Sequence, residues 1–122
     1  MNARSFEEDT PLAKTRETIW QEWRELVNMA PKELEEWLAT EASRTVGDSA
    51  SGEATGHRSG RKILQIKRTK KDDLSDEQWT HMGKVVGYIK RHRAQGGPDE
   101  NIETSAWRYS LMNWGHDPLQ GE

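Results

Sequence analysis

The sequence predicts an all-α protein, a single compact domain of about five helices in which an N-terminal helical hairpin packs on a longer central helix. Two patterns favour helices: apolar residues recur every three to four positions, and no apolar/polar alternation persists as it would in a strand. The length agrees, since 122 residues are about one domain's worth. We expect the domain to cover residues 11–119, with flexible termini at 1–10 and 120–122.

The first two predicted helices run from Pro11 to Asn28 and from Pro31 to Arg44. Thr10 can cap the first helix, and proline suits the first position of both. Only Met29–Ala30 connects them, so we expect a hairpin. Their apolar stripes contain Leu12, Ile19, Trp20, Trp23, Leu26, Val27, Leu34, Trp37 and Leu38.

Residues 45–60 are rich in Gly, Ser and Thr and predict a loop. A third helix is expected over Ser59–Thr69, with Ile63, Leu64 and Ile66 facing inward. The fourth helix, Asp76–Gln95, opens with the capping box formed by Ser75 and Gln78. Its inward residues are Trp79, Met82, Val85, Val86 and Ile89. Gly96, Gly97 and Pro98 end it.

The last predicted helix, Ser105–Trp114, leads into a closing motif that we interpret as structural. Gly115 suits a left-handed helix cap, and Pro118 prevents the helix from resuming. The motif residues are Trp107, Arg108, Trp114, Gly115, His116 and Asp117. Arg108 can pair with Asp117 or with a carboxylate of the first two helices. A binding pocket around Arg108, His116 and Asp117 is the alternative interpretation.

Composition excludes several kinds of chemistry. The chain has no cysteine, which excludes disulfides, thiolate zinc sites, iron–sulfur clusters and cysteine nucleophiles. No HExxH, GxSxG or P-loop motif is present, so we expect no enzyme, no metal and no cofactor. The histidines, which we expect at the surface or at helix caps, are His57, His81, His92 and His116.

The apolar runs are too short for a transmembrane helix, so we expect no membrane partner. The N-terminal residues show no apolar segment typical of a signal peptide. These observations predict an intracellular protein, cytoplasmic or nuclear.

The charges are segregated along the chain. Net charge is −3, but residues 1–56 carry −6, residues 57–95 carry +7 and residues 96–122 carry −4. Such asymmetry is typical of a nucleic-acid surface, or of acidic flanks that neutralise a basic centre.

The basic centre suggests an anion site at the start of the third helix. Arg58, Arg61 and Lys62 would crowd its first turn, where cations oppose the helix dipole. A phosphate bound by the amides of Ser59–Lys62 would turn this repulsion into attraction. Pairing with the acidic first two helices is the alternative.

We therefore predict a non-catalytic DNA-binding protein. The predicted phosphate contacts are Arg58, Arg61, Lys62, Lys67, Arg68, Lys70, Lys71, Lys90, Arg91 and Arg93. The two basic clusters would line one face if the third and fourth helices pack side by side. The alternative function is a protein–protein interaction module whose basic or acidic face meets an oppositely charged protein partner.

Several segments resemble a family of small proteins from bacteria and fungi that is catalogued as a domain of unknown function. They include HMGKVVGYIKRH (81–92), the SGxxxGHxSGRK pattern at 51–62 and the closing WRYSLMNWGHDPL (107–119). The resemblance covers about residues 16–119. It implies no established activity; some members carry a DNA-binding description, which agrees with the basic centre.

Overall fold

The computed structural model describes residues 15–46 and 55–120, and every regular element in these ranges is helical. The α-helices are α2 (Arg16–Leu26), α3 (Pro31–Leu38), α4 (Glu41–Thr45), α5 (Thr55–Lys67), α6 (Asp76–Gln95) and α7 (Ala106–Asn113). Two short 3₁₀ turns, η2 (Lys71–Asp73) and η3 (Ile102–Thr104), precede α6 and α7. The expectation of an all-α protein with about five helices is confirmed.

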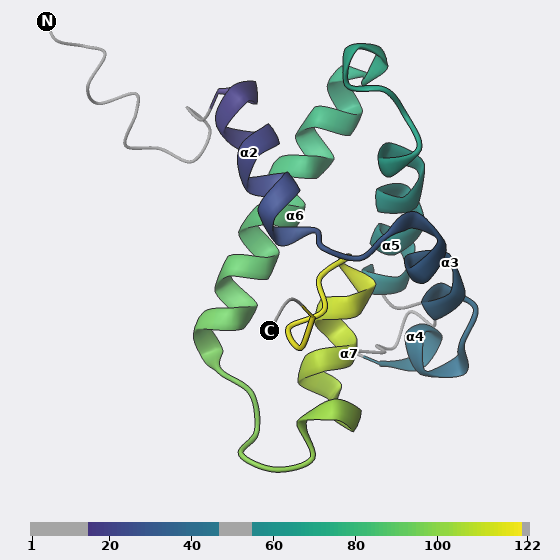
Figure 1. Cartoon of the computed structure of the whole chain (residues 1–122), viewed down its shortest axis with the longest axis vertical. Coiled ribbons are helices and arrows are strands. Elements are labelled where there is room, and N and C mark those ends of the chain that lie inside the picture. Colours follow the sequence, from purple (N-terminus) through teal and green to yellow (C-terminus); the bar gives the residue numbers. More distant parts are fainter. Residues whose placement is uncertain (1–14, 47–54, 121–122) are drawn as a thin grey trace, which may run out of the picture.

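The helices pack in two groups around α7 (Figure 1). In one group α2 lies along α6, and in the other α3 packs on α5 and α7 while α4 packs on α7. The predicted N-terminal hairpin is therefore wrong, because α2 and α3 pack on different helices. The chain between them is held instead by the closing segment, since the amide of Met29 donates to the carbonyl of Gly115 at 3.2 Å.

The fourth predicted helix is confirmed at both ends. In α6, Ser75 Oγ accepts from the Gln78 amide at 3.1 Å, and the Gln78 side chain accepts from the Ser75 amide at 2.9 Å. Gly96 ends the helix with a φ of +81°. The last helix is one residue shorter than predicted at each end, with Ser105 as its cap.

The first two predicted helices differ from the structure. The described helix α2 begins at Arg16, after Thr15, whose hydroxyl accepts from the Thr18 amide at 3.1 Å. Thr10 and Pro11 lie outside the described residues. The predicted helix over 31–44 is broken, because extended Thr40 caps a new helix by accepting from the Ser43 amide at 3.1 Å.

The predicted loop over 45–60 is partly wrong, since α5 already begins at Thr55. Gly56 and Gly60 disfavour a helix in isolation but here allow α7 to approach. A Cβ at Gly60 would lie 2.6 Å from the Asn113 carbonyl oxygen and 2.6 Å from Leu38 Cδ2. Residues 47–54 of the predicted loop lie outside the described residues.

One hydrophobic cluster joins α2, α3, α5, α6 and α7. All five predicted apolar residues of α6 are buried, as are Leu34, Leu38, Ile63 and Ile66. Of the six tryptophans, Trp23 and Trp79 are buried. The other four, which pack partly buried against the cluster, are Trp20, Trp37, Trp107 and Trp114.

A buried polar network ties α3, α4, α5 and α7 together. The Asn113 carboxamide oxygen accepts from Trp37 Nε1 at 2.8 Å and from Ser43 Oγ at 2.5 Å, while its amide donates to the Ser43 carbonyl. His57 Nδ1 lies 2.9 Å from Ser43 Oγ. The expectation of surface histidines is therefore wrong: His57 and His116 are buried, and His81 and His92 are partly buried.

Two glycine substitutions separate packing from helix propensity. Gly60→Ala is expected to lower the free energy of unfolding by about 1–3 kcal/mol, because the new methyl meets a backbone oxygen that cannot rotate away. Gly83→Ala is the matched control, since its nearest neighbour, Ile19 Cδ1, is 3.7 Å away. The control should gain about 0.5–1 kcal/mol from helix propensity. Urea denaturation measures both, and equal stability of the two variants would contradict this packing.

Candidate nucleic-acid interface

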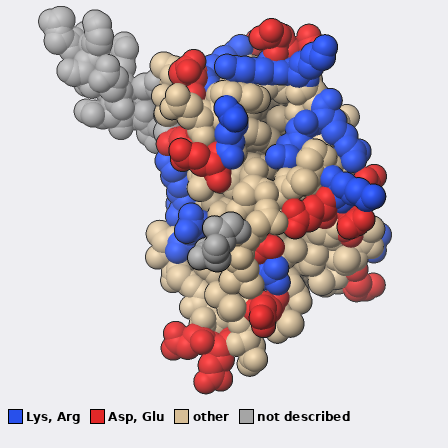
Figure 2. Space-filling view, in the orientation of Figure 1, with Lys and Arg blue, Asp and Glu red and all other residues tan. Residues whose placement is uncertain are grey.

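The exposed face of α5, together with the residue that follows its last turn, carries a basic stripe, which we define as Arg58, Arg61, Lys62 and Arg68. Their spacing places them on one side of the helix, and all four are exposed. With Leu64 and Gln65 they line an open hollow of about 450 Å³. Figure 2 shows Lys and Arg side chains gathered over the upper and right-hand parts of the molecule, where α5 and the start of α6 lie.

The start of α5 differs from the prediction, and this changes where an anion could bind on the helix. Because α5 begins at Thr55, Arg61 and Lys62 lie in its second turn and no longer face the free amides of its first turn. Ser59 and Gly60 are buried inside the helix. The predicted phosphate site on the amides of residues 59–62 is therefore wrong, and an anion would have to contact the side chains of the stripe.

The other predicted cations of this segment have different surroundings. Lys67 is half-buried, its Nζ lies 3.4 Å from the Val27 carbonyl, and burial lowers its pKa. Lys71 Nζ lies 5.1 Å from the centre of the Trp20 ring. Lys70 is exposed, and Arg68 of the stripe pairs with Glu35 at 3.0 Å. Exposed ion pairs of this kind contribute little to stability, so a phosphate can replace the Glu35 carboxylate as the partner of Arg68.

The second basic cluster does not join the first. Lys90, Arg91 and Arg93 lie near the C-terminal end of α6, whereas the end of α5 meets the start of α6 (Figure 1). Lys90 also points toward α2, where it pairs with Glu22 at 2.6 Å. The expectation that both clusters line one face is therefore wrong.

A groove between α5 and α6 lies beside the stripe. It is open, measures about 530 Å³, and shares Lys62 and Gln65 with the hollow on α5. Its other lining residues are Ile66, Asp76, Glu77, Gln78, Thr80, His81 and Lys84. Ser59 Oγ on α5 lies 2.9 Å from His81 Nε2 on α6, a contact that joins the two helices.

Sequence reasoning missed His81 and Lys84 as candidate interface residues. Lys84 follows His81 by three positions, so both lie on one face of α6. The three-residue spacing could have been recognised in the sequence. That these two residues lie close to Ser59 and Lys62 of α5 is known only from the structure. Burial, together with the charges of Lys62 and Lys84, lowers the pKa of His81, although a hydrogen bond to the backbone of Ser59 acts in the opposite direction.

Five stacked rings follow the seam between α6 and α7. In order they are His81, Trp114, Tyr88, His92 and Trp107, with successive centres 6.2, 4.1, 5.2 and 6.3 Å apart. The angles between neighbouring planes are 11–18°. Trp107 Nε1 also donates to the His92 carbonyl at 3.0 Å. We call this the ring column; it gives Trp107 and Trp114 a packing role, and it ends on His81 at the groove.

Comparison with known proteins identifies the family. The family model described as a protein of unknown function, DUF3140, matches residues 22–112. The chain belongs to the DUF3140 family. The match spans the stripe, the groove and most of the ring column. Neither the search of curated proteins nor the search of solved structures finds a match.

The closing motif of this DUF3140 chain forms a clasp, as expected. Arg108 donates two hydrogen bonds to the Asp117 carboxylate, at 3.0 and 2.9 Å, and its Nη1 donates to the Glu103 carbonyl at 2.9 Å. Burial acts to raise the pKa of Asp117, but the hydrogen bond from Arg108, the Leu119 amide and nearby positive charge together hold it below its usual value. Gly115 has a φ of +83°, so its left-handed turn is also confirmed.

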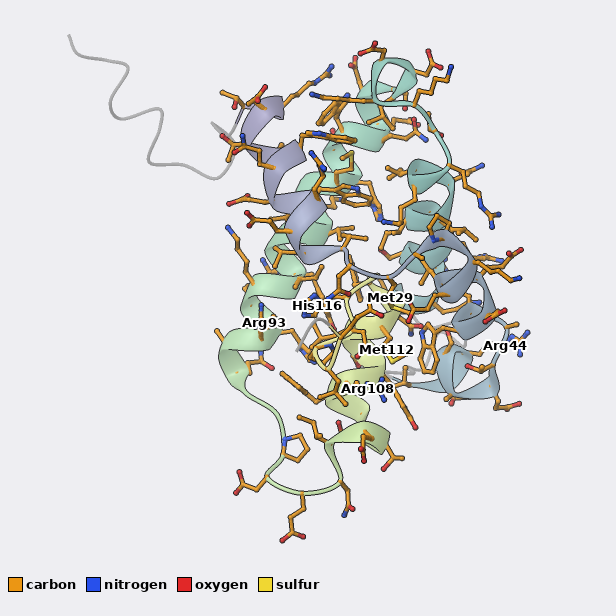
Figure 3. The ribbon with its side chains drawn as sticks, in the orientation of Figure 1. Met29, Arg44, Arg93, Arg108, Met112 and His116 are labelled. Atoms are coloured by element: carbon orange, nitrogen blue, oxygen red, sulfur yellow. The ribbon has the colours of Figure 1, made fainter. Side chains whose placement is uncertain are left out.

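The clasp also holds the α2–α3 connection of the DUF3140 chain. Asn28 exchanges two hydrogen bonds with the backbone of Asp117, at 3.1 and 2.8 Å. The Gln120 side chain donates to the Asn28 carbonyl. His116 Nδ1 lies 2.6 Å from the Leu26 carbonyl. Figure 3 shows His116 between Arg93 on one side and Met29 on the other.

The buried histidines predict acid sensitivity of the DUF3140 fold. Burial is the largest cause that lowers the pKa of His81, His92 and His116. The unfolded chain therefore takes up protons below about pH 6.5 that the folded chain resists, so the free energy of unfolding falls as pH falls. Urea denaturation at pH 7.5, 6.5 and 5.5 should show a progressive loss, and His116→Gln should make it smaller. Unchanged stability between pH 6.5 and 5.5 would contradict this account.

Among residues 15–46 and 55–120, no group of three metal-ligating carboxylate or imidazole side chains comes together. In the same ranges, no helix is long and apolar enough to cross a membrane. The arrangement that remains is a basic helix face beside a groove.

Proposed function

We propose that this DUF3140 protein is a non-catalytic nucleic-acid-binding protein that contacts DNA phosphates through the basic stripe on α5. The observation that carries the proposal is the spacing of Arg58, Arg61, Lys62 and Arg68 along one exposed helix face. The ten helical steps from Arg58 to Arg68 span about 15 Å, a length comparable to the width of a DNA groove. Lys67, Lys70, Lys71 and Lys84 add positive charge around the stripe.

The chemistry of the stripe suits phosphate better than bases. Arginine guanidinium groups form paired hydrogen bonds with phosphate oxygens, and three of the four stripe residues are arginine. Phosphate contacts fix position and carry no sequence information, so we expect weak sequence preference. DNA is found inside cells, which agrees with the cytoplasmic or nuclear location that the sequence predicts.

A competition experiment distinguishes DNA from an acidic protein partner. A fluorescein-labelled 20-bp duplex is titrated with the protein at 50 mM salt and followed by anisotropy. Saturable binding is expected, and unlabelled duplex should displace the label far better than poly-L-glutamate of equal charge. Absence of duplex binding, or equal displacement by polyglutamate, would reject DNA and favour the protein-interaction alternative.

A further inference from the structure

One ring, the imidazole of His81, both lines the groove between α5 and α6 and belongs to the ring column. His81 is the terminal ring of the ring column, with Trp114 stacked on it at 6.2 Å and Ser59 Oγ bonded to its Nε2. His81 is partly exposed and is one of the residues that line the groove. Because these two contacts already hold the imidazole in place, stacking of a second ring on it would cost little additional side-chain entropy.

Positive charge stands on both sides of this ring. Lys62 follows Ser59 by three residues on α5, and Lys84 follows His81 by three residues on α6. Since α5 and α6 run in opposite directions, Lys62 and Lys84 lie on opposite sides of the Ser59–His81 bond along the helix axes (Figure 1). Together with burial, the charges of Lys62 and Lys84 lower the pKa of His81.

The end of the groove that lies at the start of α6 is acidic. Asp76 and Glu77 lie at the start of α6, and Asp76 already pairs with Arg16 at 2.6 Å. Lys84 is about two turns, or ~12 Å, from Asp76 along the helix. A phosphate is therefore attracted to Lys62 and Lys84, which flank His81. It is repelled from the far end of the groove, where Asp76 and Glu77 lie.

We propose that this groove binds one unpaired nucleotide of a nucleic-acid strand, with its base stacked on His81 and its flanking phosphates on Lys62 and Lys84. The inference rests on the proposed function and extends it to a distinct ligand, an unpaired base. Its volume of about 530 Å³ lies in the range of small-molecule sites. A base inside a duplex has both faces covered and cannot stack on a side chain, whereas an unpaired base can.

The stripe and the groove are continuous, which supports one strand crossing both. Lys62 and Gln65 line both hollows, so a strand that leaves the groove passes directly onto α5. A junction between duplex and single strand fits this surface better than a blunt duplex does.

Three labelled probes test the proposal with the full chain: a blunt 20-bp duplex, the same duplex with a three-nucleotide dT overhang, and dT12 alone. The overhang is expected to raise affinity about tenfold over the blunt duplex, the range that one stacked base supplies. His81→Ala should remove this gain, and His81→Phe, which keeps a ring, should retain it. Equal affinities for blunt and overhang duplexes would overturn the proposal.

The probes also separate this proposal from the duplex proposal. Binding of dT12 that depends on the ring at position 81, without binding of the blunt duplex, supports the groove and rejects the stripe. Binding of the blunt duplex, together with an affinity for dT12 that His81→Ala leaves unchanged, supports the stripe and rejects the groove. If His81→Ala lowers the melting temperature too far, Lys84→Glu, an exposed change at the groove, should weaken dT12 more than blunt duplex. Equal weakening of both would overturn the groove proposal.

Discussion

Reversal of Arg61 and Lys62 to glutamate should lower affinity for a 20-bp duplex by at least about 100-fold at 50 mM salt, because two phosphate contacts become two repulsions. Both side chains are exposed, so the fold should tolerate the change. Fluorescence anisotropy measures the affinity, and circular dichroism checks the helix content.

A matched double variant controls for net charge. Arg24→Glu with Arg44→Glu makes the same change in charge on α2 and α4, outside both hollows, at exposed positions. It should lower affinity by less than about tenfold, the loss due to long-range charge alone. Equal losses in the two double variants would mean that binding follows net charge and not the stripe.

Removal of Arg108 should produce the largest loss of stability by a polar substitution. The Arg108 and Asp117 side chains are only 20% and 8% exposed, so Arg108→Ala leaves a buried carboxylate without its partner. Breaking a buried pair costs about 3–5 kcal/mol, and partial exposure of Arg108 reduces this to about 2–4 kcal/mol. Such a loss is a large fraction of the stability of a small domain. Urea denaturation measures it.

A double-mutant cycle tests whether the two residues act as a pair. Arg108→Ala with Asp117→Asn should recover part of the stability that Arg108→Ala loses, because no charge is then left buried. Arg44→Ala is the control, an exposed arginine on α4 that should change stability by less than about 0.5 kcal/mol. Strictly additive losses at positions 108 and 117 would contradict the pairing.

Helix ends marked by capping residues or glycine could be predicted from the sequence. The boundaries of α6 follow from the Ser75–Gln78 box and from Gly96, and the structure agrees with them. Because Arg108 is the sole cation after residue 95, its pairing with Asp117 was one of the two predicted alternatives, and the structure shows that pairing.

The errors arose where tertiary contacts outweigh local preference. Gly56 and Gly60 indicated a loop, but their small size is what allows α7 to pack on α5. The break at Thr40 lacks a Gly or Pro signal and depends on a threonine cap. The prediction of histidines at the surface or at helix caps fails because their partners, including Ser43 and Leu26, come from other helices.

The candidate interface was predictable in part. The stripe residues follow from charge density along residues 54–71. Their separation from Lys90, Arg91 and Arg93, and the meeting of His81 with Ser59, follow only from the way α5 and α6 pack.

The salt dependence of duplex binding tests the central claim most directly. The affinity of the unmodified chain for the 20-bp duplex is measured between 50 and 200 mM salt. Four stripe contacts predict a slope of log K against log salt of about −3.6, a loss of about 100-fold over this range. A slope near zero, or no binding at 50 mM salt, would contradict the claim that the α5 stripe binds nucleic-acid phosphates.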